Sequence, residues 1–170
     1  MRLPKLADVR VIFLEVEGVI MPPVVKMVAR LLQKPIVAFK PSIDALNLIL
    51  SETKAELVIT DSGDKEYNQA TQTKLREWGV RTTTFGRLPI IKGKGNGIIK
   101  WMSMAGEPES FVIIDCDEKR WGNMLRPYVI IADPESGGLT EALAKKAIGI
   151  LKKGKRKNGR GINGRSNAQS

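Results

Sequence analysis

Short runs of apolar residues recur along the chain and predict a set of β-strands. Four of these runs are continuous rather than alternating and rich in β-branched residues: 9–14 (VRVIFL), 56–60 (ELVIT), 111–114 (FVII) and 128–132 (YVIIA). Continuous apolarity is typical of central strands in a parallel sheet, which are covered on both faces. A more polar run at 80–84 (VRTTT) predicts an edge strand.

Segments with helical spacing separate these runs. Ser42 is a candidate N-terminal cap for one helix, and Thr140 is a candidate cap for the last one. Two further helices are predicted at 67–78 and 97–105, each followed by a glycine. Because strand and helix alternate, the sequence predicts a doubly wound α/β fold with a mainly parallel sheet.

Polar residues follow three of the predicted strands, at the edge where such sheets bind ligands. They are Glu15, Glu17, Thr60, Asp115 and Asp117, and Lys92 and Lys94 precede the predicted helix at 97–105. Singly, acidic residues after strands are more often turn formers and helix caps. Their joint placement favours a site, because converging carboxylates bind Mg²⁺ and a nearby lysine would balance a phosphoryl group held on the metal.

The composition narrows the chemistry that such a site could perform. The 170 residues include no histidine and a single cysteine, Cys116. Ser-His-Asp and Cys-His catalysis, an internal disulfide framework and a Cys-rich zinc cluster are therefore excluded. Carboxylate, lysine or hydroxyl chemistry remains, with or without a hard cation.

The length fits one domain, and no window approaches the roughly 20 apolar residues that a membrane span needs. No apolar segment with a small-residue cleavage site follows the N-terminus. We therefore expect a cytoplasmic protein with no membrane partner.

Positive charge is concentrated at the C-terminus. The chain has 28 Lys and Arg against 18 Asp and Glu, and the stretch 152–170 contains no acidic residue. Its basic residues are Lys152, Lys153, Lys155, Arg156, Lys157, Arg160 and Arg165. The Gly, Asn and Ser between them cannot form a core, so we expect a globular domain at 1–151 and a disordered basic tail at 152–170. Such a tail favours the phosphates of RNA or DNA, although a solubilising terminus or an acidic protein partner would also fit it.

The sequence also resembles a known family in five pieces that occur in the family's order. FLEVEGVI at 13–20 is similar to the FLDVDGVL opening of haloacid dehalogenase (HAD)-like phosphohydrolases. The later pieces are LVITDS, GRLPIIKGKGNGIIKWM, FVIIDCD and ADPESGGLTEALAKKAIGIL, and the small HAD domain of RNA-repair-associated and phage-type proteins is the most similar. The resemblance covers roughly 9–151 and implies a Rossmannoid three-layer sandwich. Residues 21–40 are too few for a separate cap domain, so we expect a minimal cap or none and an open active face.

The resemblance implies roles for residues at matching positions. In such enzymes the first Asp of the opening motif attacks the phosphoryl group, and the Asp two residues later serves as acid and base. Here these positions hold Glu15 and Glu17. Thr60 matches the hydroxyl that binds the transferring phosphoryl, and Lys94 best matches the basic residue before the third helix, with Lys92 close enough to compete.

The resemblance also implies a Mg²⁺ site. Its ligands would be Glu15, Glu17 and Asp115. A second Asp is common directly after the last of these, but this chain has Cys116 there, which leaves Asp117 as a substitute.

The departures from the family pattern separate two functions. A Glu in place of Asp moves the attacking oxygen by about an ångström, and a displacement of that size can lower a rate by on the order of a hundredfold. The segment after Thr60 reads DSGDK where related domains carry Ser-Trp-Arg, so a basic phosphate contact is missing. The favoured hypothesis is a degenerate HAD-like domain that binds phosphate-bearing partners, chiefly nucleic acid, with little or no phosphatase turnover. The alternative is an active Mg²⁺-dependent phosphohydrolase acting on nucleotides or nucleic-acid phosphate ends.

Overall fold

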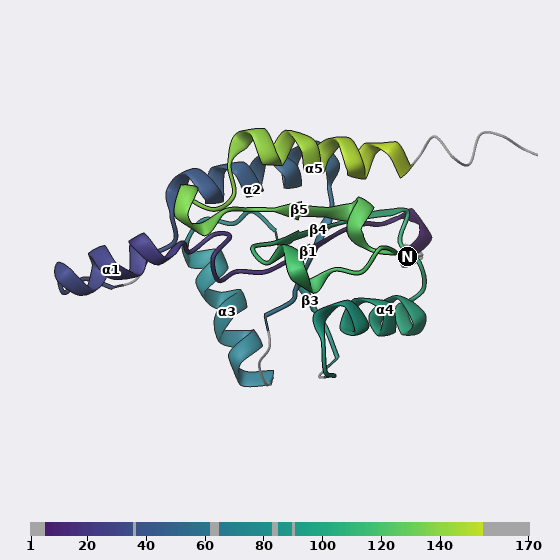
Figure 1. Ribbon diagram of the computed structural model, residues 1–170, viewed down its shortest axis with the longest axis horizontal. Helices are drawn as coiled ribbons and strands as arrows, with labels where there is room; N and C mark the ends of the chain where they lie inside the picture. Colours follow the sequence, from purple (N-terminus) through teal and green to yellow (C-terminus); the bar gives the residue numbers. More distant parts are fainter. Residues whose placement is uncertain (1–5, 36, 62–64, 83–84, 90, 155–170) are drawn as a thin grey trace, which may run out of the picture.

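A five-stranded parallel sheet forms the centre of the computed structural model, which describes residues 6–35, 37–61, 65–82, 85–89 and 91–154 (Figure 1). The strands are β1 (Arg10–Leu14), β2 (Glu56–Ile59), β3 (Phe85–Arg87), β4 (Ser110–Asp115) and β5 (Val129–Ile131). Their order is β3-β2-β1-β4-β5, and every neighbouring pair is parallel. The chain winds outward from β1 first to one edge and then to the other, which confirms the predicted doubly wound α/β fold and puts the switch point between β1 and β4.

The central strand is apolar throughout because both of its faces are covered. Ile12 and Leu14 belong to one core cluster, and Val11 and Phe13 belong to the other. All four side chains are fully buried. The ring of Phe13 also meets Trp101 edge-on, with 5.4 Å between ring centroids. Because both faces of β1 are buried, its sequence is a continuous apolar run from Val11 to Leu14, as predicted for a central strand.

Helices form the outer layers of the sandwich. They are α1 (Pro23–Leu31), α2 (Lys40–Thr53), α3 (Lys65–Glu77), α4 (Lys94–Ala105) and α5 (Glu141–Lys153). Figure 1 shows α2 and α5 side by side on one side of the sheet and α4 on the opposite side. None of the helices in the described part of the chain has the length and apolar character that crossing a membrane requires.

One of the two predicted helix caps is confirmed and the other is wrong. The Thr140 hydroxyl accepts a hydrogen bond from the backbone N–H of Leu143, 3.3 Å away, as an N-cap does. Ser42 lies inside α2, which begins at Lys40. Its hydroxyl instead donates to the carbonyl oxygen of Gly137 at 2.9 Å, so it joins α2 to the segment before α5.

The predicted edge strand at 80–84 is misplaced, because the structure has the edge strand β3 at Phe85–Arg87. Residues 83 and 84 lie outside the described residues, and two backbone N–H groups before them bond elsewhere. The N–H of Val80 donates to the carbonyl of Leu75, and the N–H of Arg81 donates to the Asn47 side chain of α2 at 2.8 Å. The start of the 80–84 segment is therefore the turn that follows the C-terminus of α3 (Lys65–Glu77).

Helix α1 was not predicted. Pro22 is its N-cap residue and Pro23 its first residue; consecutive prolines indicate a turn, but proline is also favoured in the first turn of a helix. Figure 1 shows α1 projecting from the body of the domain, and it is the only α-helix in the described stretch between β1 and α2. This short insertion agrees with the expected minimal cap.

Helix α5 extends beyond the expected end of the globular domain. It continues to Lys153, so Lys152 and Lys153 are helical and are not part of a disordered tail. Lys152 Nζ also lies 3.2 Å from Glu52 Oε2 of α2. The other basic residues assigned to the tail, namely Lys155, Arg156, Lys157, Arg160 and Arg165, lie outside the described residues.

Candidate active site

The carboxyl ends of the three central strands meet at one edge of the sheet. β1 lies between β2 and β4, and all three run in the same direction. Thr60 follows β2 and donates its N–H to the carbonyl of Leu14 at 2.9 Å, while Glu15 follows β1 and donates its N–H to the carbonyl of Ile114 at 3.0 Å. Asp115 is the last residue of β4. The predicted convergence of these side chains therefore follows from parallel pairing that continues one residue past β1.

Glu15 is held at both carboxylate oxygens. Its Oε1 accepts hydrogen bonds from Lys94 Nζ at 2.7 Å and from Arg120 Nη1 at 3.1 Å. Its Oε2 accepts hydrogen bonds from the backbone N–H and the thiol of Cys116, each at 3.1 Å. Burial acts to raise the pKa of Glu15, but the hydrogen bonds from Lys94 and Cys116 and the charge of Lys94 outweigh it and lower the pKa to about 2. The side chain is therefore a carboxylate at neutral pH.

Asp115 is fully buried and shares its cationic partners with Glu15. Its Oδ2 lies 3.2 Å from Lys94 Nζ and 3.8 Å from Arg120 Nη1, and its Oδ1 accepts the N–H of Asp117 at 2.8 Å. Burial raises the pKa of Asp115, while the hydrogen bond from Asp117 and the charge of Lys94 act in the opposite direction. Two buried carboxylates thus face the same ammonium and guanidinium groups.

Lys94, and not Lys92, reaches these carboxylates. Lys94 is the first residue of α4, and its side chain is 15% exposed, whereas Lys92 lies on the exposed surface before the helix. The chain turns into α4 at Gly93, whose φ of 88° favours glycine, so the helix starts three residues earlier than predicted. At Gly97 a Cβ would lie 3.2 Å from Leu88 Cδ1, so the glycine allows α4 to pack closely against the segment that precedes it.

The side chain of Glu17 makes its ion pair outside the carboxylate cluster. Its Oε2 pairs with Lys26 Nζ of α1, and 44% of its side chain is exposed. The two glutamates of the first motif therefore have different surroundings, because Glu15 lies among Lys94 and Arg120 and Glu17 faces the helix that follows its loop.

Asp117 lies at the rim of the carboxylate cluster. It caps the short 3₁₀-helix η2 (Glu118–Arg120) by accepting the N–H of Lys119 at 3.0 Å, and its other oxygen accepts Arg120 Nε at 3.0 Å. Its backbone N–H bonds to Asp115, as described above. It is therefore connected to the cluster through Arg120 and its own backbone.

Two residues of the site were not identified from the sequence. Arg120 gave no signal, because only the η2 turn returns its guanidinium to the strand ends. Asp61 could have been suspected, since it directly follows Thr60. Its carboxylate accepts the N–H of Val16 at 2.6 Å and the N–H of Glu17 at 3.1 Å, and thus fixes the loop that follows Glu15. Burial raises the pKa of Asp61, although these two hydrogen bonds act to lower it.

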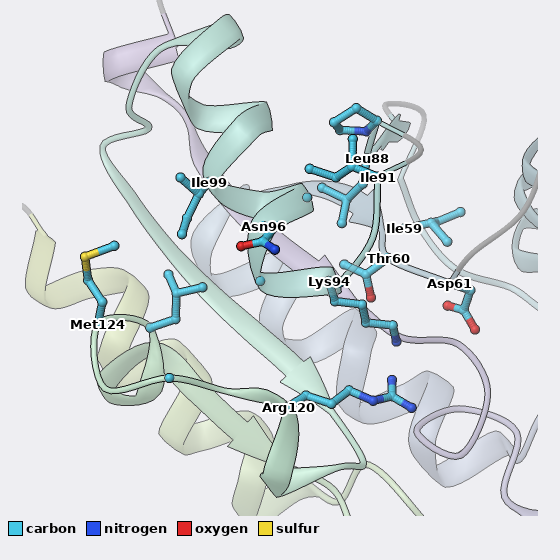
Figure 2. Close-up of a pocket in the computed structure, with 16 residues that line it drawn as sticks. Ile59, Thr60, Asp61, Leu88, Ile91, Lys94, Asn96, Ile99, Arg120 and Met124 are labelled. Carbon is cyan, nitrogen blue, oxygen red and sulfur yellow. The ribbon is translucent and has the colours of Figure 1, made fainter.

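A cavity of about 730 Å³ opens beside the carboxylates. Figure 2 shows Lys94 and Arg120 extending toward one another at one end, with Thr60 and Asp61 nearby. The first turn of α4 also lines the cavity, and the remaining wall is largely apolar: Ile59, Leu88, Pro89, Ile91, Ile99, Met124 and Leu125. One end of the cavity therefore carries charged side chains, the cations Lys94 and Arg120 beside the carboxylate of Asp61, and the other end is apolar.

One group in the described part of the chain could hold a metal ion. It consists of Glu15, Asp115 and Cys116, whose candidate ligand atoms lie within 4.8 Å of one another. Burial, together with the hydrogen bond and charge of Glu15, raises the pKa of Cys116 to about 12, so its sulfur is a thiol in the metal-free site. The two carboxylates do fit a hard divalent cation, which prefers oxygen ligands.

Comparison with known proteins places this geometry in a family. No curated protein and no solved structure matches the chain. A family model described as "HAD domain in Swiss Army Knife RNA repair proteins" matches residues 11–144, which include every described residue of the carboxylate cluster. The chain therefore belongs to this family of HAD domains from RNA repair proteins.

Proposed function

We propose that this HAD domain binds phosphate-bearing partners, chiefly the phosphorylated ends of RNA or DNA, with little or no phosphatase turnover. The observation that carries the proposal is the state of Glu15, the residue at the nucleophile position. Both of its oxygens are engaged, Oε1 by Lys94 and Arg120 and Oε2 by Cys116. A carboxylate attacks phosphorus through a free, correctly aimed oxygen, so these contacts oppose attack.

Two cationic side chains that line the charged end of the cavity support phosphate binding. Lys94 supplies an ammonium group and Arg120 a guanidinium, which can bind phosphate oxygens through two parallel hydrogen bonds. The N-terminus of α4, a helix of 12 residues, lines the same cavity through Gly93, Gly95 and Asn96. Unpaired backbone N–H groups and the helix dipole add to the attraction for an anion there.

Mg²⁺ is the cofactor expected of the family, and Glu15 and Asp115 are the residues that would hold it. A bound ion would neutralise charge on the phosphoryl group. Glu17 and Asp117 were also predicted as ligands, but Glu17 pairs with Lys26 and Asp117 with Arg120.

One observation favours the alternative, an active phosphohydrolase. The pKa of Glu15 is about 2, so the group has the ionised form that a nucleophile requires. Thr60 also lies at the edge where the phosphoryl group would bind. Activity would require Lys94 and Arg120 to leave Oε1 when substrate enters.

A binding experiment tests the proposal. Fluorescence anisotropy would compare a labelled single-stranded oligonucleotide with a 5′-phosphate, with a 3′-phosphate and with neither. We expect at least one phosphorylated end to bind about tenfold more tightly than the unphosphorylated strand, because it adds charge-assisted hydrogen bonds. Equal affinity for all three oligonucleotides would contradict the proposal.

The same titrations separate the cavity from the basic tail. A chain ending at Gly154 retains α5 and lacks five basic residues of the tail. We expect it to bind every oligonucleotide more weakly. The slope of the logarithm of the binding constant against the logarithm of the salt concentration should become shallower by up to about 3 to 4. The preference for the phosphorylated end should persist, since the tail contributes only contacts that the three oligonucleotides share.

A further inference from the structure

Three carboxylates converge on one guanidinium. Arg120 Nη1 lies 3.1 Å from Glu15 Oε1 and 3.8 Å from Asp115 Oδ2, and Arg120 Nε lies 3.0 Å from Asp117 Oδ2. Two of these acids, Glu15 and Asp115, are also the residues that would hold Mg²⁺. The guanidinium of Arg120 therefore lies between these carboxylates, where a metal ion would otherwise bind.

The local structure fixes this guanidinium in place. Asp117 caps η2 through the N–H of Lys119, and Arg120 is the last residue of the same turn, so Asp117 and Arg120 meet as an i, i+3 pair. The Arg120 side chain is 40% exposed, whereas the Glu15 and Asp115 side chains that it meets are 8% and 0% exposed. The guanidinium thus reaches from the cavity wall into a buried acidic cluster.

We infer that Arg120 is an internal cation that competes with Mg²⁺ for Glu15 and Asp115, so that the site binds a phosphate group on Arg120 and Lys94 without needing a metal ion. The part of this inference that concerns phosphate rests on the proposed function. Competition with the metal rests only on the contacts of Arg120.

Physical chemistry favours the internal cation. A guanidinium is weakly hydrated, whereas Mg²⁺ gives up its water reluctantly and demands near-octahedral geometry. The side chain is tethered beside its partners, so binding costs no association entropy, while free Mg²⁺ must be recruited from solution. A divalent ion beside Glu15 Oε1 would also lie close to the ammonium of Lys94 and be repelled by it.

The guanidinium still has capacity for a ligand. Among the described residues its hydrogen bonds use Nε and Nη1, which leaves the donors of Nη2 for another partner. Arg120 and Lys94 both line the cavity. A phosphate oxygen entering there could accept a hydrogen bond from each without displacing the carboxylates.

Direct metal binding tests this inference. The binding of MnCl₂, a paramagnetic probe of Mg²⁺ sites, would be followed by electron paramagnetic resonance in the full-length chain and in Arg120→Met. The matched control is Arg126→Met, which removes an equal charge from an exposed residue of the neighbouring 3₁₀-helix η3 (Arg126–Tyr128). We expect Arg120→Met to bind Mn²⁺ at least about tenfold more tightly than the wild type, because its two buried carboxylates lose a competing cation, and Arg126→Met to match the wild type.

A second substitution separates charge from folding defects. Arg120→Lys keeps the positive charge, so its Mn²⁺ affinity should stay close to that of the wild type. Circular dichroism would establish that Arg120→Met and the wild type are both folded. The inference is overturned if folded Arg120→Met binds Mn²⁺ no more tightly than the wild type. A tenfold gain in Mn²⁺ affinity in both Arg120→Met and Arg120→Lys would also overturn the inference.

Binding of inorganic phosphate in EDTA tests the second half of the inference. The wild type should show saturable phosphate binding without metal, and Arg120→Met should bind phosphate at least about tenfold more weakly. If the wild type ignores phosphate and phosphorylated ends under all conditions, the proposed function fails, while the Mn²⁺ result still decides whether Arg120 competes with the metal. If the wild type binds phosphate only with Mg²⁺ present, the proposed function stands and the metal-free mode is wrong.

Discussion

Replacing Lys94 with methionine should abolish the preference of the protein for a phosphorylated oligonucleotide end. Lys94 Nζ bonds to Glu15 at 2.7 Å and to Asp115 at 3.2 Å, and it lines the cavity. The substitution removes a phosphate ligand and also leaves two buried carboxylates with less positive charge to balance them, so the cavity would repel an anion. We expect the phosphorylated end to lose at least about tenfold in affinity, as measured by anisotropy.

Lys92→Met is the matched control for this experiment. It changes the net charge equally, two residues away, at an exposed position before α4. It should preserve the preference for the phosphorylated end. Circular dichroism checks that Lys94→Met remains folded. A preference that survives in Lys94→Met, or that is lost equally in Lys92→Met, would show that the phosphate binds elsewhere.

Replacing Gly138 with alanine should strongly destabilise the fold near the site. Gly138 has a φ of 76°, and a Cβ there would lie 2.2 Å from the carbonyl oxygen of Val19. That oxygen also accepts the N–H of Leu139 at 2.8 Å, so the loop after β1 and the segment before α5 are in backbone contact. Because the clashing atom is a backbone oxygen, a change of side-chain rotamer cannot relieve the clash. We expect the free energy of unfolding to fall by about 3 kcal/mol or more, measured by denaturant titration.

Gly149→Ala is the matched control, and we expect it to raise the free energy of unfolding. Gly149 lies in α5, and a Cβ there would meet nothing within 4 Å. Alanine favours the helix over glycine, so the free energy of unfolding should rise by about 0.5–1 kcal/mol. A Gly138→Ala protein as stable as the wild type would show that the two loops are not packed as described.

The strands were predictable because the sheet is covered on both faces. β1, β2 and β5 lie within predicted apolar runs, and β4 extends the run at 111–114 by one residue at each end. The fully buried side chains of Ile12 and Phe13 on opposite faces of β1 show the reason. The edge strand β3 has only three residues, and the polar run before it was a misleading signal. The backbone of Arg81 bonds to the Asn47 side chain, a contact between segments 34 residues apart that no local pattern reveals.

Most of the residues brought together at the site were predicted from their place after strands and from the family resemblance. Glu15, Thr60, Asp115 and Lys94 all lie at the same edge of the sheet. Glu17 was placed with them by sequence spacing, but it faces Lys26 of a helix that was not predicted.

The contacts of the two additional site residues could not be derived from local pattern. Arg120 reaches Glu15 across 105 positions of sequence, and Asp61 reaches Val16 across 45. Both contacts exist only because parallel pairing brings distant strand ends together. Under the proposed function, Arg120 after β4 would supply the basic contact that is missing from the second motif.

These contacts suggest how a phosphatase fold can be used for binding. The ionised carboxylate at the nucleophile position is retained, yet its charge balances Lys94 and Arg120. The longer Glu side chain extends its carboxylate far enough to meet both cations and the Cys116 N–H. Under the proposed function, Glu15 would hold Lys94 and Arg120 in position to bind a phosphate group.

The most direct measurement is the release of inorganic phosphate from nucleotides and from 5′- and 3′-phosphorylated oligonucleotides in the presence of Mg²⁺. The wild type would be compared with Glu15→Gln, which has nearly the same shape and no charge at the nucleophile position. We expect no release by the wild type above the level of Glu15→Gln, although the wild type binds the phosphorylated strand. Mg²⁺-dependent release by the wild type that is lost in Glu15→Gln would contradict the binding role and establish a phosphohydrolase with a glutamate nucleophile.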